Sequence, residues 1–321
     1  MEKNMISKSA KDYHASMPFY EIRLSVTGAC NQNCVYCGPF ADGKHNRGYG
    51  FITLDQARLL VDELKDIINE QKIHVQITGG EPTLRYDLIK IFALLNEKIR
   101  DIGMTTNGSR INLKLVKELV DNGLSDLHVH LSSLNKDVFQ KTTRAVFDEN
   151  RIQNILDAAM YIKEMGKRVE FNTPVTHINL LTLIELLDFC YKNKINLKLI
   201  EELKLDDSSH ISSTTIKEML SDWISKNKIP TMETKIRNRY GVIYQFDDDF
   251  FFRIAHVDEE FKKSLTGVSK KILLDGRYWV GGKDNQFLFT PSYSLPPTKG
   301  TIQDLREQIE ATSRIYKELL G

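Results

Sequence analysis

The order of apolar and polar residues predicts alternating strands and helices over the first two thirds of the chain. Apolar side chains occupy every second position in residues 20–27, which is typical of a strand with one buried face. A helix is predicted to begin after Thr53. Thr53 and Gln56 have the spacing of a capping box, and apolar residues then recur at helical intervals.

The same alternation continues as far as residue 205. Further strands are predicted at residues 73–78, 102–106, 127–131, 168–173 and 195–200. The helices predicted between them cover residues 87–98, 113–122, 151–165 and 180–191. Strands that alternate with helices favour a parallel sheet with helices outside it. A complete (β/α)8 barrel needs eight units and this chain offers six, so we predict an α/β fold with a partial (β/α)6 TIM-type barrel.

The pattern changes after residue 205. A polar linker precedes an amphipathic helix at residues 216–225, and a last helix is predicted at residues 301–320. The aromatic-rich extended runs between them are residues 240–246, 250–255, 271–280 and 287–290. We therefore expect three parts, which are an N-terminal leader (1–19), the partial barrel (20–205) and a small C-terminal α+β appendage (206–321).

The composition and charge of the chain disfavour several classes of protein. The 321 residues carry 44 basic and 43 acidic side chains, so no strong field would attract a nucleic acid polymer. No apolar run approaches the roughly 18–20 residues that span a bilayer, and residues 1–15 lack the apolar core of a secretory signal. Four cysteines in a chain of this size suit a reducing compartment. We expect a cytoplasmic protein without a membrane partner.

Three of the four cysteines lie within eight residues, as Cys30-x3-Cys34-x2-Cys37. Thiolates this close can turn onto one metal centre if the backbone loops around it. Structural zinc normally takes four Cys or His ligands, and no second pair lies nearby. Three thiolates suit a 4Fe–4S cluster with one iron left open. A disulfide with a spare thiol, buried thiols and a structural zinc site remain the alternatives.

A second motif, Gly79-Gly80-Glu81-Pro82, follows the second predicted strand. Two glycines let a ligand approach the backbone, and Glu81 can hold a charged amino group. A simple turn is the alternative interpretation of two glycines. Other polar residues, Thr106, Asn107 and Asn172, lie at the ends of later strands. Ligands of parallel α/β folds bind at that edge, so both motifs point to one site.

With the aromatic Tyr36 before the last cysteine, the cysteine motif resembles that of the radical S-adenosylmethionine (SAM) superfamily. Over residues 20–205 the chain is most similar to the GTP 3′,8-cyclase branch. The resemblance implies an enzyme with one 4Fe–4S cluster on Cys30, Cys34 and Cys37, whose open iron is chelated by SAM. Reductive cleavage of SAM would then produce a 5′-deoxyadenosyl radical that abstracts hydrogen from an organic substrate. It also implies an electron donor such as flavodoxin or ferredoxin.

The resemblance assigns roles to individual residues. Gly79, Gly80 and Glu81 would bind the amino group of SAM, and the backbone of Tyr36 would lie near the adenine. Thr106, Asn107 and Asn172 would contact its ribose or carboxylate, with helix caps or turns as the alternative. Arg23 matches an arginine that reaches the substrate in the cyclase, and Arg85 is a weaker match.

The chain also departs from the cyclase. Its fourth strand reads Val-His-Leu-Ser where the cyclase reads Val-Ser-Leu-Asp. We predict that His130 is a core histidine, with a place in the lining of the cavity as the alternative. No cysteine follows Cys190, itself predicted to lie in the core, so the cyclase's second cluster has no ligands. We expect a small-molecule substrate of the nucleotide, nucleoside or nucleoside-derived sugar class. Modification of a ribosomal peptide is the alternative. A non-catalytic iron–sulfur or zinc protein, such as an electron carrier or sensor, is a rival that has no use for the Gly-Gly-Glu motif.

Overall fold

The computed structural model describes residues 21–37, 51–70, 72–145, 148–201, 211–235, 242–255, 277–283, 286–290 and 298–320. The expected leader, residues 1–19, lies outside these ranges.

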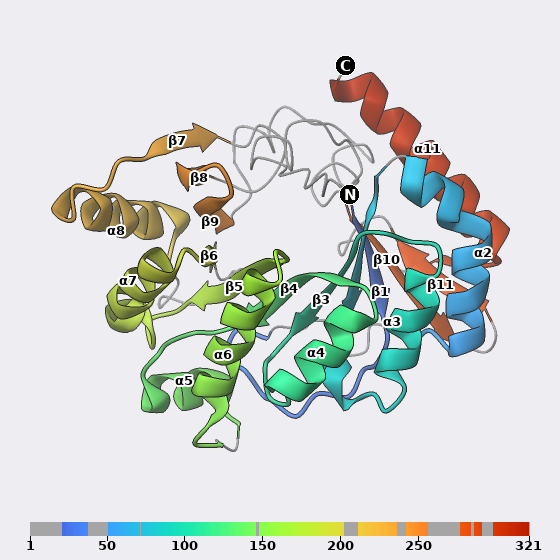
Figure 1. Ribbon diagram of the computed structural model, residues 1–321. Coiled ribbons are helices and arrows are strands. Elements are labelled where there is room, and N and C mark those ends of the chain that lie inside the picture. The colour runs from blue at the N-terminus through green and yellow to red at the C-terminus, as the bar shows by residue number, and fades with distance from the viewer. Residues whose placement is uncertain are drawn as a thin grey trace, which may run out of the picture.

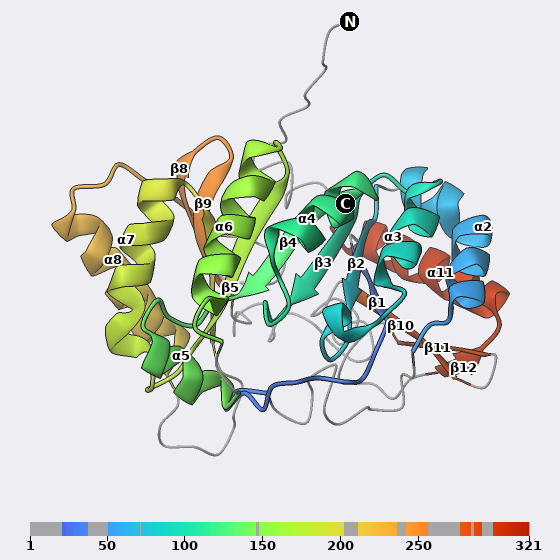
Figure 2. The ribbon, with the colours of Figure 1, turned by 60° about the horizontal axis from the view of Figure 1, so that its bottom comes forward.

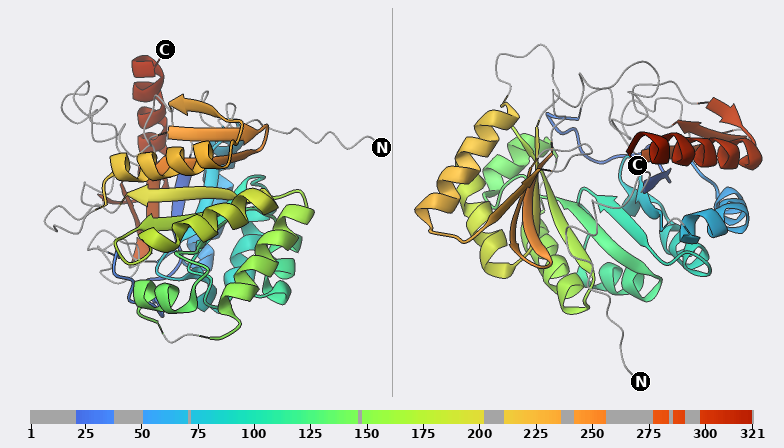
Figure 3. Two further views of the ribbon diagram at one scale, coloured as in Figure 1. Left: turned by 90° about the vertical axis from the view of Figure 1, so that its left-hand side faces the viewer. Right: turned by 90° about the horizontal axis from the view of Figure 1, so that it is seen from above.

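Six parallel strands form the centre of one sheet, in sequence order and joined by helices (Figure 1). The strands are β1 (Glu21–Ser25), β2 (His74–Thr78), β3 (Ile102–Thr106), β4 (Leu124–His130), β5 (Arg168–Val175) and β6 (Asn196–Glu201). The helices are α2 (Leu54–Glu70), α3 (Leu88–Asn96), α4 (Leu113–Asp121), α5 (Lys136–Thr143), α6 (Arg151–Glu164) and α7 (Leu183–Asn193), with short 3₁₀ turns η1 (Pro82–Leu84) and η2 (Leu180–Thr182). The sheet curves with the helices on its outer side, as Figure 3 shows.

The C-terminal part adds strands to both edges of this sheet. β10 (Arg277–Lys283) pairs in parallel with β1, and β9 (Phe250–Ala255) pairs in parallel with β6. The remaining elements are β7 (Met232–Lys235), β8 (Val242–Asp247), β11 (Gln286–Thr290), β12 (Thr298–Gly300), α8 (Ser213–Lys226) and α11 (Ile302–Leu320). The two ends of the twelve-stranded order are β12 and β7, which do not pair, so the described sheet stays open and the predicted partial barrel is confirmed. The division into a barrel and an appendage at residue 205 stays a prediction.

The apolar side chains on the outer face of the sheet pack against the helices and form the hydrophobic core with them. Leu24, Ile77, Val129 and Phe171 point to this side, and each side chain is fully buried. The alternation predicted for the strands therefore reflects apolar packing on one face, which is the main stabilising contribution of a helix-covered sheet. None of the described helices is long and apolar enough to cross a membrane.

Local sequence signals explain where several helices begin. The backbone N–H of Thr53 donates to Oε1 of Gln56 at 3.0 Å, and that of Gln56 donates to Oγ1 of Thr53 at 3.1 Å, so the predicted capping box is confirmed. Helix α5 was not predicted, because it is short and polar with one buried aromatic residue, Phe139. The side chain of Asn135 caps its first turn by accepting from the backbone N–H groups of residues 137 and 138.

Candidate functional site

The loop that carries the cysteines is held by backbone hydrogen bonds on both sides. The N–H groups of Gly80 and Glu81 donate to the carbonyl oxygens of Thr27 and Ala29, at 2.7 and 2.8 Å. Further along, the N–H groups of residues 33 and 35 donate to the last two residues of α5, Thr143 and Thr142. Figure 2 shows this loop, in blue, running from the end of β1 to α5. The two sequence motifs are therefore adjacent in space.

Gly79 and Gly80 are required by this close approach. Gly79 has φ +144°, and a Cβ at this position would lie 2.3 Å from the carbonyl oxygen of Thr27. A Cβ on Gly80 would lie 2.4 Å from the carbonyl oxygen of Ala29. The sequence interpretation placed a ligand against these glycines, whereas the structure places the chain's own cysteine loop there. Their contact with SAM stays a prediction.

None of the three cysteines forms a disulfide, and all three are partly buried. Sγ of Cys34 donates to Oε1 of Gln32 at 3.0 Å, and Nδ2 of Asn107 donates to Sγ of Cys30 at 3.7 Å. Burial raises the pKa of Cys34 to about 11, and the negative charges of Cys37 and Cys30 add to this effect. A positively charged centre bound at this thiol would oppose the effect and favour the Cys34 thiolate.

The donor set of the loop, three cysteine thiols, is of the kind that holds a 4Fe–4S cluster. Within the described ranges, no three side chains of Cys, His, Asp or Glu converge on one metal ion. Tetrahedral zinc, with Zn–S bonds of about 2.3 Å, would bring its sulfur ligands within roughly 4 Å of one another. A 4Fe–4S cube binds each thiolate through a different iron and so tolerates a wider spacing.

Glu81 joins the ends of β2 and β3. Its carboxylate is completely buried. Oε1 accepts hydrogen bonds from the backbone N–H and hydroxyl of Thr83 and from the hydroxyl of Thr106, at 3.0, 2.6 and 2.7 Å. Oε2 accepts from the backbone N–H of Asn107 at 2.6 Å. The structure thus brings Glu81, Thr106 and Asn107 together beside Cys30, and it gives Glu81 a structural role that the sequence did not indicate.

Tyr36 contacts the end of β4 through its side chain. Its hydroxyl lies 3.0 Å from Nδ1 of His130, and the ring centroids are 5.1 Å apart. Burial lowers the pKa of His130 to about 3, and the nearby charge of Arg151 contributes, so the imidazole is neutral. His130 is therefore buried as predicted, but it lies at the site rather than in the apolar core.

Several buried polar atoms around His130 have no hydrogen-bond partner among the described residues. Asn172 lies opposite His130 on β5, and Ser132 follows at the end of β4. The unpartnered atoms are Nε2 of His130, Oγ of Ser132 and Oδ1 of Asn172. Buried polar groups without partners are rare and point to a missing ligand or water.

Arg151, at the start of α6, was missed by the sequence analysis. Its guanidinium lies over the ring of Phe139, 5.4 Å from the centroid, and its Nε and Nη2 have no hydrogen-bond partner among the described residues. Burial lowers the pKa of Arg151, while the charges of Cys34 and Glu81 oppose this effect, which places the guanidinium near both motifs. A buried cation without hydrogen-bond partners suits an anionic group of a ligand.

The two arginines proposed from the resemblance lie in different surroundings. Arg23 is on the inner face of the sheet, opposite the helices, and its Nε lies 2.5 Å from Oε1 of Glu21. Arg85 instead donates to the carboxylate of Asp87 and to two backbone carbonyls, those of Val26 and Ile52. Arg85 therefore links the carboxyl end of β1 to the segment before α2. Cys190 is buried in α7, as predicted.

Comparisons with known proteins show the family to which the chain belongs. A family model described as "Radical SAM superfamily" matches residues 24–190. The GTP 3′,8-cyclase of Staphylococcus carnosus is 30% identical over 275 residues, which cover 82% of this chain and 78% of that protein. The GTP 3′,8-cyclase of Clostridium perfringens is 30% identical over 210 residues, which cover 64% of this chain and 62% of that protein.

The fold is also found in a solved structure. The structure of Streptococcus suis SuiB bound to S-adenosylmethionine superimposes with a TM-score of 0.59 and 17% identity. The superposition covers 89% of this chain but only 61% of SuiB. At this identity the likeness concerns the fold alone.

Proposed function

Because the chain belongs to the radical SAM superfamily, we propose that Cys30, Cys34 and Cys37 hold its single 4Fe–4S cluster and that SAM binds beside them. Members of this superfamily are enzymes that use these two cofactors, and together the bound cofactors supply a 5′-deoxyadenosyl radical that removes a hydrogen atom from the substrate. The observation that carries the proposal is the contact of the three-thiol loop with Gly79, Gly80 and Glu81.

We propose that SAM lies between the cysteine loop and the ends of β4 and β5. Arg151 would bind its carboxylate, because this buried guanidinium has unused donors near Cys34 and Glu81. Ser132 and Asn172 would offer their unpartnered oxygens to the hydroxyl or amino groups of SAM. Thr106 and Asn107 shape the neighbouring wall through their bonds to Glu81.

For the substrate we propose a nucleotide, nucleoside or nucleoside-derived sugar. The similarity to GTP 3′,8-cyclases over most of the chain supports this class. The chain has no cysteine after Cys190, so a purine would be recognised by protein side chains rather than by a second cluster. Arg23, on the inner face, is the proposed contact for an anionic group of the substrate. Modification of a peptide stays the alternative; SuiB, which shares the fold, has also been solved bound to the precursor peptide SuiA.

The proposal is tested by SAM cleavage in anaerobically reconstituted protein reduced with dithionite. Wild type should contain about 4 Fe per chain and release 5′-deoxyadenosine. Cys34→Ala should lose this activity, whereas Cys190→Ala is the matched control, because its thiol is buried in α7. Activity retained by Cys34→Ala would remove the cluster assignment. The substrate class is tested by whether guanosine, GTP or UDP-glucose increases the release of 5′-deoxyadenosine.

A further inference from the structure

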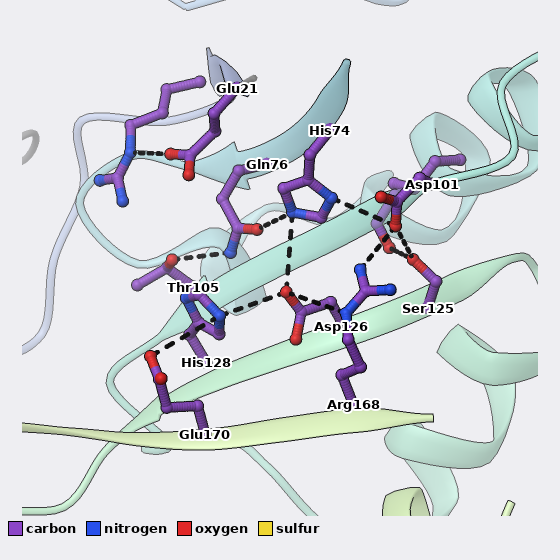
Figure 4. A network of polar contacts seen from close by, with 12 residues as sticks. Glu21, His74, Gln76, Asp101, Thr105, Ser125, Asp126, His128, Arg168 and Glu170 are labelled. Atoms are coloured by element: carbon purple, nitrogen blue, oxygen red, sulfur yellow. Dashed lines mark hydrogen bonds and ion pairs between the residues drawn. The ribbon is translucent and has the colours of Figure 1, made fainter. Parts of the chain in front are cut away.

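The inner face of the sheet carries ionisable side chains in place of an apolar filling. The inward positions of β2, β4 and β5 include His74, Gln76, Asp126, His128 and Glu170, all largely buried (Figure 4). The interior of a (β/α)8 barrel is usually filled by branched apolar residues. Burying charged groups costs several kcal/mol each unless they are paired, so a network of this kind calls for a functional explanation.

His74 lies between two carboxylates of this network. Its Nδ1 lies 3.2 Å from Oδ1 of Asp101, and its Nε2 lies 3.7 Å from Oδ2 of Asp126 and 2.5 Å from Oε1 of Gln76. Burial alone would lower the pKa of His74, but the carboxylates of Asp101 and Asp126 raise it to about 9. His74 is therefore held as a cation, with a carboxylate near each ring nitrogen.

His128 differs from His74 because carboxylates lie near only one of its ring nitrogens. Nε2 lies 3.2 Å from Oδ2 of Asp126 and 3.9 Å from Oε1 of Glu170. Nδ1 is buried and has no hydrogen-bond partner among the described residues. In Figure 4 the ring lies between these two carboxylates on neighbouring strands.

Both carboxylates next to His128 stay ionised. Burial would raise the pKa of Asp126, but His128 and Arg168 hold it well below its usual range. Burial would likewise raise the pKa of Glu170, but Arg253, His128 and Lys198 lower it. Ionised carboxylates accept hydrogen bonds and cannot donate them, so Nε2 of His128 must carry a proton to bond to them. A ring with a single proton would therefore have its lone pair on Nδ1.

His128 also lies below the proposed SAM site. It is two residues before His130 on β4 and points to the same face, so it lies about 6–7 Å deeper along the strand. His130 in turn contacts Tyr36 of the cysteine loop. A substrate held on the inner face beneath the cysteine loop would therefore have the radical source above it and His128 below it.

We propose that His128 is an acid–base residue of the reaction and accepts a proton from the substrate through Nδ1. This rests on the proposed function, and it selects substrates whose reacting carbon carries a hydroxyl or amino group, as in the sugar of a nucleoside. After the hydrogen atom has left that carbon, the O–H or N–H bond breaks and its electron pair stays on the oxygen or nitrogen. An N–H bond forms at Nδ1, the unpaired electron stays on the substrate, and nothing is oxidised or reduced in this step. Asp126 and Glu170 then offset the charge of the imidazolium.

The first test needs no substrate. Nitrogen-15 NMR of labelled histidines in the oxidised, cluster-loaded protein reports which ring nitrogen carries the proton, with His128→Gln and His74→Gln providing the assignments. At about pH 8 we expect His128 as the Nε2–H form and His74 with both nitrogens protonated. An Nδ1–H form of His128 would overturn the proposal. Polar and charged groups on the surrounding strands influence which ring nitrogen of His128 carries the proton. They are Thr105, Asp126, His74, Arg168, Glu170, Lys198 and Arg253.

The second test measures product formed per 5′-deoxyadenosine released, with whichever of guanosine, GTP and UDP-glucose is converted. In His128→Gln the amide nitrogen can replace Nε2 toward Asp126, but nothing replaces Nδ1. We expect this ratio to fall by at least about a hundredfold, the usual effect of losing a general acid–base group. His177→Gln, at an exposed histidine outside this network, is the matched control and should keep the wild-type ratio. An unchanged ratio in His128→Gln would overturn the proposal, whereas a wild type that releases no 5′-deoxyadenosine would remove the proposed function and leave the NMR result valid.

Discussion

The hydroxyl of Tyr36 lies 3.0 Å from Nδ1 of His130, although the two residues are 94 positions apart in the sequence. The contact ties the middle of the cysteine loop to the end of β4. Because His130 is neutral and buried, its Nδ1 depends on this hydroxyl for a partner. The side chain of Tyr36 is therefore part of the support of the loop, in addition to any contact its backbone makes.

Tyr36→Phe should lower the free energy of unfolding by about 1–3 kcal/mol, because it leaves a buried ring nitrogen without its partner. Urea unfolding under anaerobic conditions measures this loss. Tyr86→Phe is the control, since Tyr86 is 97% exposed and its hydroxyl is solvated. Equal midpoints for the two variants would show that the contact with His130 is energetically neutral.

Glu81→Gln should affect both stability and SAM binding. Four donors converge on the carboxylate, and an amide would turn one of its own N–H groups toward them. A hydrogen bond to a charged group is worth about 1.5–3 kcal/mol, so we expect a loss of at least this size in urea unfolding, with weaker SAM binding in equilibrium dialysis. Glu97→Gln, on the surface of the same region, is the control. Unchanged stability would contradict the structural role of Glu81.

Arg151→Gln should weaken SAM binding by roughly ten- to a hundredfold, the equivalent of about 1.5–3 kcal/mol for a lost charge-assisted contact. The effect on unfolding should be small by comparison, because the guanidinium's Nε and Nη2 have no hydrogen-bond partner among the described residues. Equilibrium dialysis with SAM and urea unfolding separate the two effects. Arg144→Gln is the control, as Arg144 is exposed at the end of α5. Equal SAM affinity in both variants would exclude Arg151 from the site.

The parts of the fold that could be predicted are those with apolar outer faces. The strand ending at Thr106 was predicted with its observed bounds, because its outer face carries the buried apolar side chains of Ile102 and Met104. β4 begins at Leu124, three residues before the predicted start, since the inward-facing Asp126 interrupts the apolar pattern. The pairing of β9 and β10 with the edges of the central sheet depends on contacts across long stretches of sequence, which local patterns do not encode.

The candidate site also contains residues that the sequence predicts and residues that only the structure reveals. The cysteine loop and the Gly-Gly-Glu segment have distinctive local spacings and could be found from the sequence. Arg151 and His128 are single polar residues whose meaning depends on what lies beside them in space. The register of β4 with β5 places His128 next to Glu170, and the packing of α6 places Arg151 near Cys34. Neither relationship leaves a motif in the sequence.

His74 should make stability depend on pH above neutrality. Its pKa of about 9 in the folded protein exceeds the ordinary value of 6.5, so the protonated form is stabilised by folding. The contribution, on the order of 3 kcal/mol, is fully present below about pH 6.5 and is lost as the pH rises through 9. Urea unfolding of wild type and His74→Gln across this range should show a difference that narrows as the pH rises. A constant difference would mean that His74 is not protonated in the folded protein.

Arg23 forms an ion pair with Glu21. Replacing either residue should change GTP affinity relative to guanosine, and the two changes should be opposite in sign. If Arg23 binds a phosphate of the substrate, Arg23→Ala should weaken the binding of GTP relative to guanosine, by about 2–5 kcal/mol if the contact is buried. Glu21→Gln removes the negative charge 2.5 Å from the guanidinium and should strengthen GTP binding relative to guanosine. A purely structural pair would lower stability in both variants and leave the ratio of the two affinities unchanged. Titration calorimetry on the cluster-loaded protein with SAM present measures this ratio. If neither ligand binds to wild type, the purine nucleotide substrate is contradicted, and a peptide becomes the better hypothesis for this site.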